Sequence, residues 1–136
     1  MLCVFDPTIW HFIDATVGLK EESTIIFNSR MSADELKDIL CNGTYPSKLS
    51  IHEYRLFSFD ATGLAMDIIG RPITNTTMMG AFSAATGLLP MDKVIEVIKE
   101  NFGKLGETNI KAAEKAYKLI KKQNQAASDR KQEKNA

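Results

Sequence analysis

The sequence predicts a three-layer α/β/α protein, in which a mostly parallel sheet lies between helices and the last third of the chain is helical. Three short apolar runs, Leu2–Phe5, Thr24–Phe27 and Leu56–Phe59, have the length and composition of buried strands. A helical pattern follows each run, and strands that alternate with helices are typical of a parallel sheet with right-handed crossovers. Beyond residue 70 the apolar spacing is helical.

Length and charge limit the possible classes of protein. With 136 residues the chain is long enough for one domain, which we place at 1–122. Its 17 basic and 17 acidic residues cancel, so nucleic acid and membranes are disfavoured as partners. No apolar stretch approaches the roughly 18–20 residues that span a bilayer, and the first residues lack the pattern of a secretory signal.

The first two helices have clear boundary signals. Residues 8–13 are expected to form a short helix after Pro7 in its first turn. Ser32 and Glu35 have the spacing of a capping box, which opens a helix that Asn42 and Gly43 end. Residues 44–50 are expected to form a loop. The weakly alternating stretch 51–59 then leads into the third strand, which ends at Asp60.

The central stretch, 70–87, is predicted to hold a buried helix. Pro72 marks a turn after a helix over 62–69, and the polar residues 74–77 supply candidate N-caps. From Met78 to Ala85 the residues are apolar or small on almost every face, which is typical of a helix enclosed by others. Gly80 lies among alanines, so another backbone can approach closely, and Gly87 is the expected helix end.

Two further helices are predicted after the central stretch. The first runs from Met91 to Phe102 with an amphipathic apolar stripe, and Gly103 and Gly106 bracket a loop. The second runs over 108–122. Residues 123–136 contain almost nothing apolar beyond alanine, so we expect a disordered polar tail there.

The predicted sheet is incomplete. Three parallel strands make a narrow sheet, and the first begins at residue 2, whereas a parallel sheet normally has covered faces and protected edges. Either another polypeptide supplies further strands, or the chain is the C-terminal part of a larger domain. We therefore expect an incomplete Rossmann-like sheet.

No self-contained active site is evident. The sequence lacks a P-loop, a G-x-G-x-x-G turn and a G-x-S-x-G elbow. Cys3 and Cys41 lack C-x-x-C spacing, so we expect reduced, buried thiols of a cytosolic protein and no metal site. Asp6 and Asp60 follow strands, where α/β folds place ligands, although each could instead cap the next turn or helix. These residues indicate a scaffold or a subunit.

The central stretch resembles a known family. Residues 70–76, with 78–82 and 85–88, are similar to the gamma subunit of 2-oxoacid:ferredoxin oxidoreductases, most of all the pyruvate type, pyruvate synthase. Residues 4–8 and 60–62 extend the resemblance, which covers roughly 2 to 120. Family members begin with a strand and a glycine-rich G-x-G-G-Q-G turn that this sequence lacks. The resemblance therefore implies the C-terminal part of such a subunit, whether truncated, partial or split.

The resemblance implies a reaction that the chain does not perform alone. A 2-oxoacid is oxidatively decarboxylated to acyl-CoA while ferredoxin is reduced. Thiamine diphosphate, iron–sulfur clusters and CoA serve the whole complex, and none is expected to bind this chain alone. The implied partners are alpha-, beta- and delta-type subunits and, through the complex, ferredoxin, in the cytoplasm. Candidate contacts to thiamine or CoA are Asp60, Arg71, Asn75 and Thr76, since they lie at a strand end and a helix start.

Two alternatives come from other classes of protein. One is a small nucleotide- or acyl-binding α/β module acting alone, which CoA or a nucleotide would stabilise. The other is a non-catalytic structural or interaction protein, which would assemble with partners without supporting catalysis. No catalytic residue and no metal ligand is predicted under any of these hypotheses.

Overall fold

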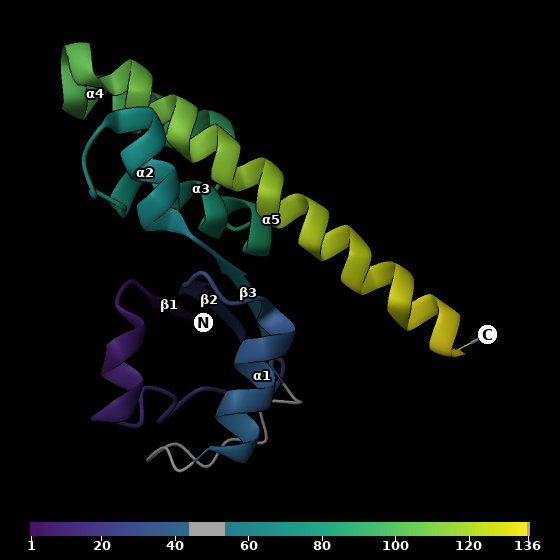
Figure 1. Ribbon diagram of the computed structural model, residues 1–136. Helices are drawn as coiled ribbons and strands as arrows, with labels where there is room; N and C mark the ends of the chain where they lie inside the picture. The colour runs from purple at the N-terminus through teal and green to yellow at the C-terminus, as the bar shows by residue number, and fades with distance from the viewer. Residues whose placement is uncertain (44–53, 136) are drawn as a thin grey trace. The chain divides into compact units, whose positions relative to one another are not determined.

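A computed structural model describes residues 1–43 and 54–135 and divides the chain into two compact units, 1–60 and 61–136 (Figure 1). The boundary lies at the end of the third strand, within the stretch that the sequence assigned to one domain over 1–122. The loop predicted over 44–50 and the start of the weakly alternating stretch at residue 51 lie outside the described residues.

The first unit contains a parallel sheet of three strands, β1 (Leu2–Val4), β2 (Thr24–Asn28) and β3 (Arg55–Phe59). The strands lie in the order β1-β2-β3, with Leu2 opposite Ile25 and Ile25 opposite Leu56. Each strand comes from one of the apolar runs, as expected for strands buried on both faces. The predicted α/β class and parallel sheet are therefore confirmed.

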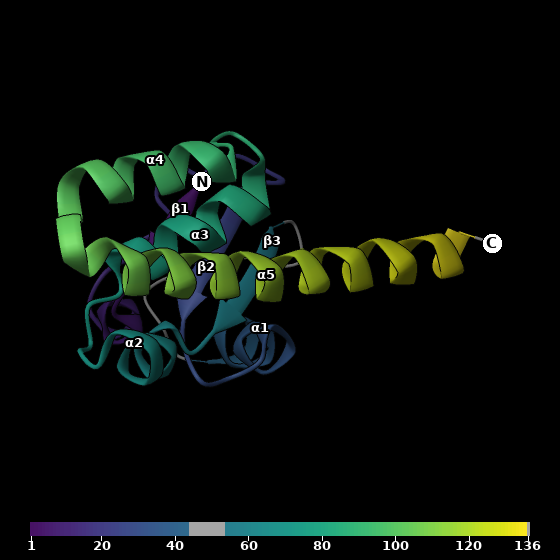
Figure 2. The ribbon, with the colours of Figure 1, turned by 90° about the horizontal axis from the view of Figure 1, so that it is seen from above.

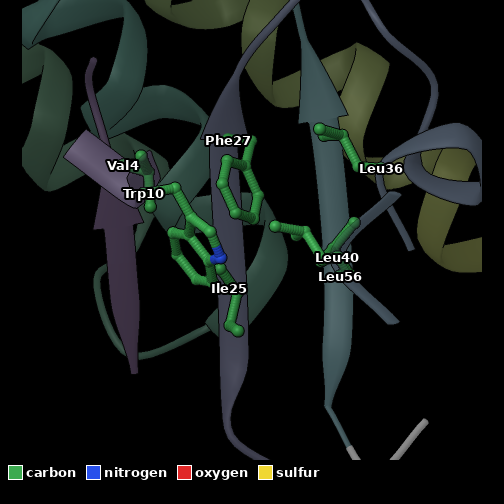
Figure 3. Packing of buried hydrophobic residues seen from close by; sticks show 7 residues of the cluster. All are labelled: Val4, Trp10, Ile25, Phe27, Leu36, Leu40 and Leu56. Carbon is green, nitrogen blue, oxygen red and sulfur yellow. The ribbon is translucent and has the colours of Figure 1, made fainter. Parts of the chain in front are cut away.

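Two helical segments cover one face of this sheet, the 3₁₀ helix η1 (Pro7–His11) and the helix α1 (Ala33–Asn42). Trp10 of η1 packs on Phe27, with their ring centroids 5.0 Å apart. Figure 3 shows the buried apolar side chains of this cluster lying together over the strands: Val4, Trp10, Ile25, Phe27, Leu36, Leu40 and Leu56.

The predicted capping box opens α1. The backbone N–H of Ser32 donates to Glu35 Oε2 at 2.7 Å, and the N–H of Glu35 donates to Ser32 Oγ at 3.2 Å. Gly43 follows the last helical residue, as the sequence predicted. The start of this helix is thus fixed by four consecutive residues.

The second unit is helical, with α2 (Ala61–Ile69), α3 (Asn75–Thr86), α4 (Met91–Phe102), a short 3₁₀ helix η3 (Gly103–Leu105) and α5 (Gly106–Asn135). Helix α3 packs against α4 and α5 (Figure 2). It is buried along most of its length, as predicted, and Gly87 ends it in the left-handed conformation with φ 66°. None of the described helices is long and apolar enough to cross a membrane.

The amphipathic stripe of α4 contributes one hydrophobic cluster to the core of the second unit. Val94 and Ile98 are fully buried and pack with Ala113 of α5. Half-buried side chains complete this cluster: Met79, Leu89, Met91, Phe102 and Ile110.

Two predictions for the end of the chain are wrong. Gly103 and Gly106 do not bracket a loop, because η3 fills that interval and Gly106 begins α5. The tail predicted to be disordered over 123–136 is helical to Asn135. The stretch 107–135 contains neither glycine nor proline and is rich in alanine, lysine, glutamine and glutamate, so nothing stops the helix. Low apolar content predicted the exposure of residues 125–130, but not their conformation.

Candidate functional site

Polar residues gather where the three strands of the first unit end. Asp6, Asn28 and Asp60 lie at or just beyond the carboxyl ends of β1, β2 and β3. Asn28 Nδ2 donates to the carbonyl of Phe5 at 2.9 Å, and the N–H of Ser29 donates to the carbonyl of Phe59 at 3.0 Å. These bonds hold the three strand ends together at the edge of the sheet where α/β proteins bind ligands.

Arg30 and Asp60 form an ion pair at this edge, with Arg30 Nε 3.2 Å from Asp60 Oδ2. The Arg30 side chain is 88% exposed and that of Asp60 is 35% exposed. An exposed ion pair of this kind contributes little to the stability of the unit. The sequence predicted Asp60 but not Arg30. The signal that could have identified Arg30 is its position as a basic residue shortly after a strand.

Asp6 caps the first turn of η1. Its Oδ1 accepts hydrogen bonds from the Thr8 hydroxyl at 2.7 Å and from the Thr8 N–H at 2.9 Å. These two bonds lower the pKa of the Asp6 carboxyl, the hydroxyl having the larger effect. Of the two possibilities that the sequence left open for Asp6, the structure shows the capping role.

The other three predicted residues belong to the second unit and flank the start of α3. Arg71 is exposed in the turn before the helix. Asn75, the first residue of α3, is exposed, and its Oδ1 accepts from the N–H of Thr76 at 2.9 Å. Thr74 is the N-cap but makes no side-chain capping bond. The helix start therefore presents one cation and one amide to solvent.

Thr76 differs from its neighbours because it is buried, with 1% of its surface exposed. Its hydroxyl bonds to Asn109 Oδ1 at 2.7 Å, and Asn109 Nδ2 donates to the carbonyl of Leu105 at 2.8 Å. This chain of bonds joins the start of α3 to the start of α5. Sequence reasoning missed Asn109 in this role, although an asparagine on the apolar face of a helix signals a buried polar partner.

The two cysteines lie outside any cluster of metal-ligating side chains in the part of the chain that the structure describes. Cys3 and Cys41 are half-buried thiols outside any disulfide, and burial raises the pKa of the Cys3 thiol. Two cysteines do not supply the set of thiolates that holds an iron–sulfur cluster. Among residues 1–43 and 54–135, no group of three or more histidine, cysteine, aspartate or glutamate residues could hold a metal ion.

Comparison with known proteins gives concordant matches. Residues 1–119 match the family described as pyruvate ferredoxin/flavodoxin oxidoreductase. The "Pyruvate/ketoisovalerate oxidoreductases common subunit gamma" of Thermococcus kodakarensis is 42% identical over 118 residues, covering 86% of this chain and 59% of that protein. "Pyruvate synthase subunit PorC" of Methanothermobacter marburgensis is 37% identical over 119 residues, which cover 87% of this chain and 58% of that protein. The chain thus spans less than two thirds of the length of these relatives.

A solved structure shares the fold. The crystal structure of pyruvate oxidoreductase subunit PORC from Thermotoga maritima superposes with a TM-score of 0.70 at 24% sequence identity. The match covers 87% of this chain and 62% of that one.

Proposed function

The chain belongs to the pyruvate ferredoxin/flavodoxin oxidoreductase family, and we propose that it acts as a gamma-type subunit of a 2-oxoacid:ferredoxin oxidoreductase. The observation that carries the proposal is the family match over residues 1–119, which includes the carboxyl edge of the sheet and the start of α3. In the proposed reaction a 2-oxoacid and CoA give acyl-CoA, carbon dioxide, one proton and two electrons. The two electrons released reduce two ferredoxin molecules.

The proposal divides the chemistry between chains. Thiamine diphosphate would supply the decarboxylation chemistry, and iron–sulfur clusters would supply electron transfer. Companion subunits of alpha, beta and delta type would hold these groups, because this chain offers two isolated cysteines and no cluster of metal-ligating residues in its described parts. A cytoplasmic location belongs to the same proposal, and cysteines outside any disulfide agree with a reducing compartment.

The contribution of this chain would come from its exposed polar groups. Arg30, Asp60, Arg71 and Asn75 present charges and an amide at a strand end and a helix start. An arginine guanidinium binds phosphate or carboxylate groups through several donors, which suits an anionic substrate such as CoA. Thr76 would act indirectly on Arg71 and Asn75 of its own unit, by fixing the start of α3 through its bond to Asn109.

Native mass spectrometry of the protein isolated from its own cells tests the assignment. A heteromeric assembly that contains thiamine diphosphate and iron–sulfur proteins, and that reduces ferredoxin with a 2-oxoacid and CoA, is the expected result. A stable monomer or simple homo-oligomer without these companions would contradict it.

Substitution of Arg71 tests the residue assignment separately. In the assembled complex, Arg71→Gln is expected to raise the KM for CoA or for the 2-oxoacid with little change in assembly, because the side chain is exposed. Arg130→Gln, which changes an exposed arginine of α5, is the matched control. Equal kinetic constants for the two variants would show that Arg71 does not contact CoA or the 2-oxoacid. The subunit assignment would remain intact.

A further inference from the structure

One short segment of the first unit exposes five large apolar side chains. They lie between residues 5 and 17, and we name them the 5–17 patch: Phe5 (48% exposed), Ile9 (41%), Phe12 (78%), Ile13 (49%) and Val17 (81%). Single exposed apolar residues are common on protein surfaces, but a concentration of this kind marks a surface that contacts another molecule.

The patch is held in a defined conformation. The N–H groups of Phe12 and Ile13 both donate to the carbonyl of Ile9 at 3.1 Å, so the three side chains emerge from one turn. Trp10 lies within the same turn and is only 2% exposed, packed on Phe27 of β2 (Figure 3). Because Trp10 anchors the segment to the core, the exposure of its neighbours is a property of the folded unit.

Carboxylates accompany the patch. Asp6 and Asp14 lie within the segment and both are exposed, the first bonded to Thr8 and the second accepting from the N–H of Thr16 at 3.0 Å. Glu21 and Glu22 follow and are also exposed. Residues 5–22 thus carry four carboxylates against one lysine and one exposed histidine, His11, so a complementary surface would be apolar with lysines or arginines around it.

We propose that the 5–17 patch docks a companion subunit of the oxidoreductase, through a surface that is apolar at its centre and basic at its rim. The inference rests on the proposed function, which supplies a multi-subunit assembly. The carboxylates disfavour a membrane, whose anionic headgroups would be repelled. They also disfavour a symmetric contact with a second copy, which would bring the same carboxylates together.

Photo-crosslinking in the intact complex tests the proposal. Phe12 is replaced by p-benzoylphenylalanine in the full chain, co-expressed with the companion subunits of its own organism. The matched control carries the same group at Leu88, which is also 78% exposed but lies in the second unit. The expected result is a crosslink from position 12 to one companion subunit, at an apolar surface flanked by lysine or arginine.

A charge substitution gives a quantitative readout. The double variant Phe12→Asp/Val17→Asp keeps Trp10 and is expected to bind that companion at least tenfold more weakly, while Leu88→Asp binds as the native chain does. Unchanged far-UV circular dichroism of the free variant would show that the loss is not unfolding. If the double variant proves unfolded, the crosslink from position 12 decides whether the 5–17 patch docks a companion subunit.

The outcomes separate the two proposals. If the native chain assembles but position 12 crosslinks to a second copy, the docking surface is overturned and the subunit function stands. The same conclusion follows if the native chain assembles and the double variant assembles equally well. Equal weakening by Leu88→Asp would also overturn it. A native chain that does not assemble with the companions would overturn both.

Discussion

Gly80 of α3 lies directly against the backbone of Ala113 of α5. A Cβ built at position 80 would overlap the carbonyl oxygen of Ala113 and stand 2.6 Å from its carbonyl carbon and 2.8 Å from its Cα. Real Cβ atoms do not approach backbone atoms this closely, and a backbone cannot rotate away as a side chain can. The crossing of the two helices therefore depends on the absence of a side chain at residue 80.

Gly80→Ala is expected to lower the free energy of unfolding by about 3 kcal/mol or more, the upper part of the range for overpacked cores. Alanine is the better helix former by about 1 kcal/mol, so helix propensity alone would stabilise the variant. The steric overlap with the backbone of Ala113 should outweigh this gain in helix propensity. Urea unfolding measures the difference.

The control for that substitution is Gly106→Ala at the start of α5. Its Cβ would meet the carbonyl oxygen of Ile98 at 3.4 Å, an ordinary contact, so this variant should be as stable as the native chain or slightly more stable. A Gly80→Ala variant that unfolds at the same urea concentration as Gly106→Ala would show that the helices do not cross this closely.

Two adjacent buried threonines are expected to respond oppositely to valine. Thr76→Val removes the hydroxyl that bonds to Asn109 and leaves a buried amide oxygen without it, which should cost about 1–3 kcal/mol. Thr77 is fully buried, and its hydroxyl has no hydrogen-bond partner among the described residues. Thr77→Val should therefore be neutral or stabilising. Thermal unfolding of both variants measures the contrast, and equal losses would contradict it.

The capping box gives the first unit a dependence on acid pH. Hydrogen bonds from the N–H of Ser32, and secondarily from its hydroxyl, lower the pKa of Glu35 below its ordinary value. A carboxyl with a lowered pKa stabilises the fold above its unfolded-state pKa, about 4.3, and this contribution is lost as the pH falls through the folded-state pKa.

Glu35→Gln should therefore make the unfolding free energy less dependent on pH between about 4.3 and the lower folded-state pKa, with a slightly less stable protein at neutral pH. Chemical denaturation from pH 7 to pH 3 measures the effect. Glu100→Gln, at an exposed position of α4, is the control. Identical pH profiles for the two variants would show that the capping box does not cause the acid dependence of the unfolding free energy.

The end of α5 should contribute helix content but little stability. A stop codon at Ala126 removes the end of α5, where residues 126–130 are exposed, so the unfolding temperature should hardly change while far-UV circular dichroism loses helical signal. A stop codon at Ala116 removes the buried residues Ala116 and Ile120, and it should prevent stable folding. A large stability loss at the first position would show that the end of the helix packs on the protein.

Much of the secondary structure could be predicted because its signals are local. Ser32 and Glu35 are three residues apart and bond to each other, and Gly87 ends α3 by adopting a positive φ of 66°, which glycine reaches at little steric cost. The three strands could be recognised because each is a short stretch rich in apolar or β-branched residues, the third within a weakly alternating stretch. The conformation of 123–135 was missed, since low apolar content limits burial without preventing a helix.

The candidate site was predicted only in part. Asp60 could be proposed from its place after a strand, but its partner Arg30 lies 30 residues earlier in the sequence. Thr76 could be placed at a helix start, but its bond to Asn109 spans 33 residues. Which polar groups meet over such separations depends on how strands and helices are arranged in space, and spacing along the chain does not encode that.

The sequence by itself thus determined the α/β class, the order of the elements, the capping box and the family, because periodicity, turn residues and motif order are properties of short stretches. Tertiary structure alone decided which face each element buries and which side chains remain exposed. The 5–17 patch shows the difference: its residues have the apolar character of a core helix, and only the packing of Trp10 on Phe27 turns their side chains outward.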